Sequence, residues 1–197
     1  MATSEYRPPV ASSGDLSGQL LLAMPGKVGG NLADTVIYIC EHTAQGALGL
    51  VINRPTELML GDLLKRIDLD LSLEIDLTRD APVFFGGPVQ TDRGFVLHAP
   101  VGGYNSSIRL GEVALTTSRD VLQDVAQGKG PERLLVTLGY AGWGAGQLEY
   151  EMSQNAWLNV AATHDILFDV PSESRYQAAL GQLGIDASML AGDAGHA

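Results

Sequence analysis

The chain has 197 residues, of which 45% are hydrophobic, so it is long enough to bury the core of one domain. Asp and Glu number 23 against 12 Lys and Arg, and the net charge of −11 disfavours nucleic acids and anionic membranes as partners. A single cysteine excludes an internal disulfide framework, and no apolar run approaches the roughly 18 residues of a membrane span, so we expect a cytoplasmic protein.

Both ends of the chain are small and polar. Residues 1–17 are rich in Ser, Pro and Gly, and we expect a disordered tail there. Residues 187–197 are expected to form a second, flexible tail. The residues between them, 18–186, contain no further linker and no internal repeat, which predicts a single domain.

Short apolar runs bounded by turn residues predict strands. The first strand, 19–24, is stopped by Pro25, and strands at 36–40 and 48–52 form a hairpin around a turn at 43–46. The run at 36–40 is apolar at every position, which is typical of a strand covered on both faces. Further strands are expected at 82–85, 94–99, 107–110, 113–116, 133–140 and 157–161, with a turn at 91–93.

Apolar residues at helical spacing predict four helices, at 60–67, 118–127, 147–157 and 172–183, with Ser118 and Ser172 as caps of the second and fourth. Residues 68–80 alternate apolar with acidic or small residues and suit an edge strand or an acidic loop. Strands outnumber helices, and many turns are too short for crossover helices. The pattern therefore favours an α+β fold with a mixed, mostly antiparallel sheet.

The hairpin carries the first candidate site, Cys40 and His42. These residues are two apart on an expected strand, so both side chains should point to the same face. A thiol beside an imidazole can ionise and act as a nucleophile or redox centre. Cys40 also lies in a solid apolar run, and free cysteine is among the most buried residue types, so a structural role is favoured.

The second candidate, Asn53-Arg54-Pro55, lies at the opposite end of the hairpin. A regular register places Val36 opposite Asn53, next to Asp34. Arg54 could bind a carboxylate or phosphate in bidentate fashion, or it could pair with Asp34 or bond a backbone carbonyl.

Two glycine-rich segments supply the other candidates. Gly86 and Gly87 follow an expected strand and form a tight bend or, with His98, a pocket wall. Residues 139–146 (GYAGWGAG) lie between a strand and a helix, but Gln147 occupies the third glycine position of a dinucleotide-binding turn and Trp143 would crowd a pyrophosphate. Amides at the start of the following helix could attract a small anion. No spacing typical of a metal site, a Walker A loop or a nucleophile elbow is present, so we expect no metal and no cofactor.

Five ordered blocks resemble the bacterial YqgE/AlgH family, UPF0301. They are LLLAMP (20–25), TVIYICEHTAQGALGLVINRP (35–55), VFFGGPVQTDRGFVLH (83–98), LGYAGWGAGQLEYEMSQNAWL (138–158) and ILFDVPSESRYQAALGQLGID (166–186). The resemblance implies one α+β domain with a curved, barrel-like sheet and flanking helices, and it implies no established activity. Residues 29–34 depart from the Asp-Pro-x-Phe-like segment that family members usually have there.

Three functions follow as hypotheses. The first is a non-enzymatic binding or regulatory protein, a monomer or weak oligomer, whose strand-end pocket takes a small anion or a protein segment. Its ligand-binding residues are Asn53, Arg54, Pro55, Gly86, Gly87, Trp143 and Gln147. The second is a thiol-dependent enzyme or redox sensor that uses Cys40 and His42. The third is a transcriptional regulator, as some family members are labelled, although no DNA-binding motif supports it.

Overall fold

The most apolar strand of the sequence lies inside the sheet, as its composition predicts. In the computed structural model, which describes residues 14–69, 81–186 and 188–190, β2 (Val36–Thr43) pairs with β1 (Gln19–Ala23) and with β3 (Gly46–Val51). Residues 36–40 are each at most 2% exposed, so both faces of this strand are covered.

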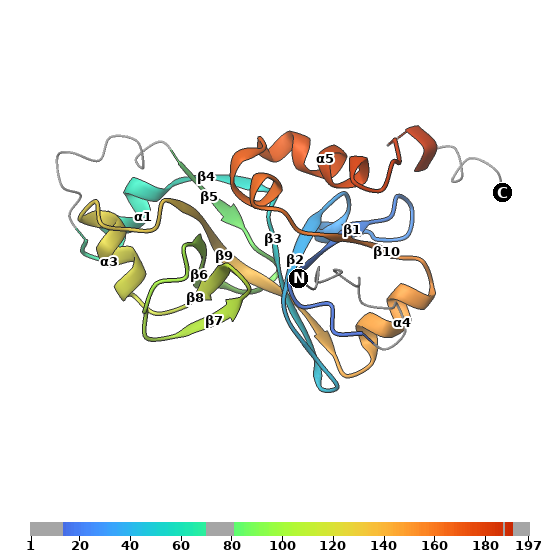
Figure 1. Ribbon diagram of the computed structural model, residues 1–197, viewed down its shortest axis with the longest axis horizontal. Helices are drawn as coiled ribbons and strands as arrows, with labels where there is room; N and C mark the ends of the chain where they lie inside the picture. The colour runs from blue at the N-terminus through green and yellow to red at the C-terminus, as the bar shows by residue number, and fades with distance from the viewer. Residues whose placement is uncertain (1–13, 70–80, 187, 191–197) are drawn as a thin grey trace, which may run out of the picture.

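The longest strand, β9 (Arg133–Gly144), joins the two halves of a curled, half-barrel sheet (Figure 1). Its last residues pair with β3, whereas its first residues pair with β6 (Val89–Ala99). The order of the main path is β10-β1-β2-β3-β9-β6-β8-β7, with β10 at Trp157–Ala161, β8 at Val113–Thr116 and β7 at Ser107–Leu110. The pairs are antiparallel along this path.

Two short strands lie off the path. β4 (Pro55–Met59) pairs with β5 (Pro82–Phe85), and β5 runs parallel to β9. The expected α+β class with a mixed, mostly antiparallel, curved sheet is confirmed.

Helices cover both faces of the sheet. A π-helical turn, η2 (Asp165–Asp169), and α5 (Arg175–Gly181) pack on the inner face. On the outer face, α4 (Gln147–Ser153) packs at one end, and α1 (Leu60–Arg66) and α3 (Asp120–Ala126) pack at the other. The 3-10 turns are η1 (Gly30–Leu32) and η3 (Ser172–Ser174). In the part of the chain that the structure describes, no helix is long and apolar enough to cross a membrane.

Strand alternation divides the core into an inner and an outer part. In β1, Leu20 and Leu22 join the inner cluster, whereas Leu21 and Ala23 join an outer cluster beneath α4. Successive side chains of a strand point to opposite faces, so the short run of leucines in β1 packs into both the inner and the outer cluster. Each fully buried leucine contributes about 1.5–3 kcal/mol of transfer free energy.

Several expected boundaries differ from the structure. The helix expected at 147–157 ends at Ser153, because Asn155 adopts a φ of 57° and the chain turns into β10. The helix expected at 172–183 starts as the 3-10 turn η3 and becomes α-helical at Arg175. The expected caps Ser118, of the helix at 118–127, and Ser172, of the helix at 172–183, make no side-chain capping hydrogen bond. Ser118 Oγ donates instead to Asp120 Oδ1 at 2.5 Å.

Other differences concern strands and ends. No turn interrupts residues 91–93, since β6 runs from Val89 to Ala99 with an irregular register. The strand β4 was not expected. The residues just before Gly18 contact the domain, because Leu16 packs beside the outer cluster beneath α4. The remaining expectations concern the two tails and the acidic segment. They fall on residues outside the described part of the chain: 1–13, 70–80, 187 and 191–197.

Candidate functional site

Cys40 and His42 point to opposite faces of the sheet, so the expectation that they share a face is wrong. The register between β2 and β3 shifts at Cys40: Ile39 faces Gly49 and Glu41 faces Leu48. Such a bulge inserts one residue and inverts the alternation beyond it. His42 therefore lies opposite Ala47, on the α4 side, whereas Cys40 stays in the inner cluster.

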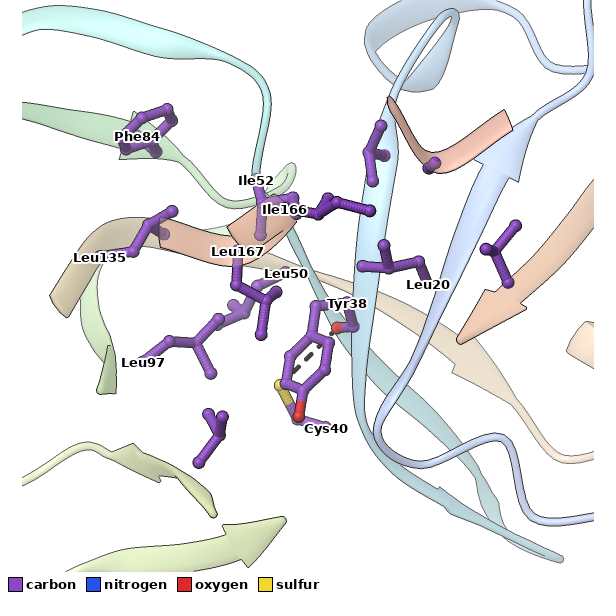
Figure 2. Close-up of a cluster of buried hydrophobic side chains, with 14 of the residues drawn as sticks. Leu20, Tyr38, Cys40, Leu50, Ile52, Phe84, Leu97, Leu135, Ile166 and Leu167 are labelled. Carbon is purple, nitrogen blue, oxygen red and sulfur yellow. Dashed lines mark hydrogen bonds between the residues drawn. The ribbon is translucent and has the colours of Figure 1, made fainter. Parts of the chain in front are cut away.

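The thiol of Cys40 is enclosed by apolar side chains of the inner cluster (Figure 2). It is 1% exposed, and its Sγ donates to the carbonyl oxygen of Tyr38 at 3.7 Å. Burial, followed by the nearby charge of Glu41, raises the pKa of the Cys40 thiol. A neutral, covered thiol without a neighbouring base is unsuited to nucleophilic chemistry.

His42 joins the start of the described chain to α4. The Leu16 N–H donates to His42 Nδ1 at 3.0 Å, so the ring proton lies on Nε2, which donates to Glu149 Oε1 at 2.5 Å. Both ring nitrogens are thus occupied, and the imidazole has a structural role.

Asn53 and Arg54 bond the backbone ahead of β2. Asn53 Oδ1 accepts from the Val36 N–H at 2.9 Å, and its Nδ2 donates to the Asp34 carbonyl at 3.0 Å. Arg54 Nη2 donates to the Ala33 carbonyl. Of the three roles considered for Arg54, the structure favours the hydrogen bond to a backbone carbonyl. Binding of a ligand by these residues stays a prediction.

Gly86 and Gly87 are buried where the chain crosses β9. A Cβ on Gly86 would lie 2.3 Å from the Gly139 carbonyl oxygen, and one on Gly87 would lie 2.0 Å from the Tyr140 carbonyl carbon. Glycine is required here for close packing, so the bend positions β5 beside β9 and presents no side chain to a ligand.

Gly142, Trp143 and Gln147 lie at the far end of β3 from Asn53. Trp143 pairs with Ala47, packs against Trp157, and lines with Gly142 a separate cavity of about 490 Å³ at the hairpin end. Gln147 Oε1 accepts from the Gly144 N–H at 3.0 Å. The structure therefore does not bring the three expected parts of the pocket together.

A different cavity opens beside the strand end that carries Asn53 and Pro55. Pro55 pairs with Phe84, and Phe84 lines an inner cavity of about 410 Å³ together with Arg175. The other lining residues come from α1, the start of β5, the start of β9 and η2: Leu60, Ala81, Pro82, Glu132, Arg133, Leu134, Leu135, Val136, Phe168 and Asp169.

Arg175 is the unusual member of this set. It is only 5% exposed; its Nε donates to the Val170 carbonyl at 2.9 Å, and Nη1 donates to the Ile52 carbonyl. Its Cζ lies 5.1 Å from the centroid of the Phe84 ring. Among the described residues, no carboxylate lies within ion-pair distance of this guanidinium, and Nη2 has no hydrogen-bond acceptor. Burial lowers the pKa of Arg175 to about 10, although the charge of Glu173 acts in the opposite direction.

An outer cavity of about 570 Å³ shares Glu132 and Arg133 with the inner one. Arg133 Nη1 pairs with Asp169 Oδ2 of η2 at 2.9 Å. The outer cavity is lined by both charged and apolar residues. Its other lining residues are Ala99, Pro100, Val101, Arg109, Glu112 and His164. We call the two cavities together the β9 groove.

Sequence reasoning placed Arg175 in a helix but did not identify it as a site residue. One signal was available: Arg175 occupies the same face of α5 as the buried Ala179. A charged residue at an apolar helical position indicates a buried cation, which needs a partner.

The comparisons with known proteins agree with one another. A family model described as AlgH-like matches residues 20–188. A UPF0301 protein of Bordetella petrii is 70% identical over 187 residues, covering 95% of this chain and 92% of its own length. A UPF0301 protein of Burkholderia mallei is 58% identical over 186 residues, covering 93% of this chain and 96% of its own.

Two solved structures are similar as well. The solution structure of the AlgH protein from Pseudomonas aeruginosa is 49% identical, with a TM-score of 0.76, and the match covers 96% of this chain and all of that one. A crystal structure of a protein from Corynebacterium diphtheriae has a TM-score of 0.65 at 16% identity, covering 83% of this chain and 85% of its own, and it supports the fold alone.

Proposed function

This chain belongs to the AlgH-like family, UPF0301, and we propose that it is a non-enzymatic binding protein that takes a small organic anion in the β9 groove. One observation carries the proposal. The guanidinium of Arg175 is buried in the wall of a cavity and has no carboxylate partner among the described residues. A desolvated charge is costly unless an opposite charge balances it, and a bound anion would supply that charge.

The position of the groove supports the same proposal. It lies where β5 and β9 begin and where β6 ends, and residues at strand ends and in loops commonly carry function. One wall belongs to η2, in which the Val170 N–H bonds the Asp165 carbonyl at 2.7 Å in the π-helical pattern. Such turns occur frequently at functional sites.

The other two hypotheses have less support. A thiol enzyme needs a nucleophile and a base within reach of each other, and Cys40 and His42 point away from one another. A regulator that binds DNA would have to overcome the net charge of −11. A regulatory role through ligand binding remains part of the proposal. So does a cytoplasmic location, which the free cysteine suits.

The test is a titration of the ¹⁵N-labelled protein with acetate at constant ionic strength, followed by amide chemical shifts. We expect saturable shifts confined to residues at the start of β9, in η2 and around Arg175. The variant Arg133→Gln removes a cation shared by both cavities and should weaken binding. The matched control is Arg93→Gln, since Arg93 stacks on Phe95 and lines neither cavity of the groove. Shifts that are scattered over the surface, or equal losses in both variants, would refute the proposal.

A further inference from the structure

The inner cavity is lined by two cations and two carboxylates, and among the described residues only Arg133 and Asp169 form an ion pair. Arg133 is paired with Asp169, and Glu132 is exposed at the rim shared with the outer cavity. Among the described residues, Arg175 donates to two backbone carbonyls, which carry no net charge, and it forms no ion pair, although the charge of Glu173 acts on it from beyond ion-pair distance. A monoanion fits this count. A dianion would bring a second charge into the cavity without a partner.

The walls of the inner cavity specify the rest of the ligand. Eight of its twelve lining residues are apolar, and two of these, Phe84 and Phe168, are aromatic. Phe168 belongs to η2 and is half-buried, so part of its ring is available for contact. Mainly apolar walls with a small number of placed polar groups are typical of sites that bind small organic molecules.

From this charge count and this lining we infer that the inner cavity binds a monocarboxylate with an apolar body, such as a medium-chain alkanoate. The inference rests on the proposed function, because it names the ligand of the same groove. The carboxylate accepts from Nη2 of Arg175, and the hydrocarbon body contacts Phe168 and its apolar neighbours. Binding relieves the unfavourable burial of the guanidinium, which is the same burial that lowers its pKa.

The test is a series of straight-chain alkanoates from acetate to octanoate, measured by calorimetry and by amide shifts on the wild-type protein. Each added CH₂ contributes about 0.8 kcal/mol when it is buried, which corresponds to about fourfold tighter binding. We expect affinity to rise by about this factor per carbon. Inorganic phosphate, the dianionic probe, should bind no more tightly than acetate.

A variant locates the apolar contact. Phe168→Ala removes a ring from the cavity wall and should weaken octanoate at least about tenfold while leaving acetate unchanged. Tyr150→Ala is the matched control, because Tyr150 is 65% exposed on α4 and lines neither cavity of the groove. Octanoate affinity should not change in this control.

The outcomes separate the inference from the proposed function. If acetate binds in the groove but affinity does not rise along the series, the inference is overturned and the proposed function stands. If phosphate binds tightest, the ligand is a phosphorylated compound and the inference is overturned in the same way. If no anion perturbs the groove, both fail.

Discussion

The reactivity of Cys40 offers a quantitative test of how the sheet is built. The thiol is 1% exposed, and the bulge in β2 turns His42 to the opposite face. A thiol reagent therefore reaches Cys40 only when the sheet opens. In the unfolded chain at pH 8, a thiol with its ordinary pKa of about 8.5 is roughly one-quarter ionised and reacts readily.

The size of the protection follows from the cost of opening. If exposure of the inner cluster costs about 5 kcal/mol, at the low end of domain stability, only about one molecule in 5,000 is open at any time. We therefore expect the native protein to react with an aromatic disulfide reagent at least about 1,000-fold more slowly than the protein in 6 M guanidinium. Absorbance of the released thiolate measures both rates.

The opposite result would revive the thiol hypothesis. A native rate within tenfold of the denatured rate would mean that Cys40 is accessible. If that rate also fell in His42→Gln, the imidazole would be acting as its base, and the placement of the two residues on opposite faces would be wrong.

Three further predictions concern single side chains. Gly87→Ala should lower the free energy of unfolding in urea by about 3 kcal/mol or more, because a Cβ would lie 2.0 Å from a backbone atom and φ is +154°. Gly103→Ala is the control: a Cβ there meets open space, so it should cost less than about 0.5 kcal/mol. Equal losses in the two variants would refute the crossing of the chain over β9. His98 is buried, its Nδ1 donates to the Pro100 carbonyl at 2.9 Å, and burial lowers its pKa below 6.5. Protonation of His98 therefore favours the unfolded state, and the free energy of unfolding should fall as the pH decreases through 6.5. Imidazole resonances that show His98 fully protonated at pH 6 would contradict this. Asn53→Ala should cost about 1–3 kcal/mol by leaving the Val36 N–H unbonded while alkanoate binding is retained; lost binding at unchanged stability would return a ligand role to Asn53.

Local patterns predicted most of the strands, but they missed β4 and failed at positions set by packing. The run at 36–40 predicted a strand covered on both faces, and its burial agrees. Nothing in the sequence marks the bulge at Cys40, because an extra residue in a strand is revealed only by its partner, β3. The helix that begins at Gln147 was predicted to be longer than it is, although Asn155 is a residue that often adopts the left-handed conformation after a helix.

The proposed site lies near the strand end predicted from the sequence, but it centres on a different arginine. The predicted register was off by one residue at this end, because the bulge shifts the pairing and Val36 faces Ile52 rather than Asn53. Asn53 nevertheless lies beside Asp34, away from His42. The buried arginine in the cavity wall is Arg175, which bonds the Ile52 carbonyl across 123 residues of sequence. Arg54 was selected because it leaves the sheet at the hairpin end, beside Asp34. A contact between segments so far apart depends on how α5 packs over the inner face, which local sequence does not determine.

The most direct test of the account is a titration of the Arg175 guanidinium itself. In protein labelled with ¹³C and ¹⁵N arginine, the side-chain resonances of Arg175 should shift on addition of octanoate and saturate at the dissociation constant obtained by calorimetry, while those of Arg93 stay fixed. If the Arg175 resonances do not move when octanoate binds, the anion does not contact this cation, and the assignment of the β9 groove as its site is wrong.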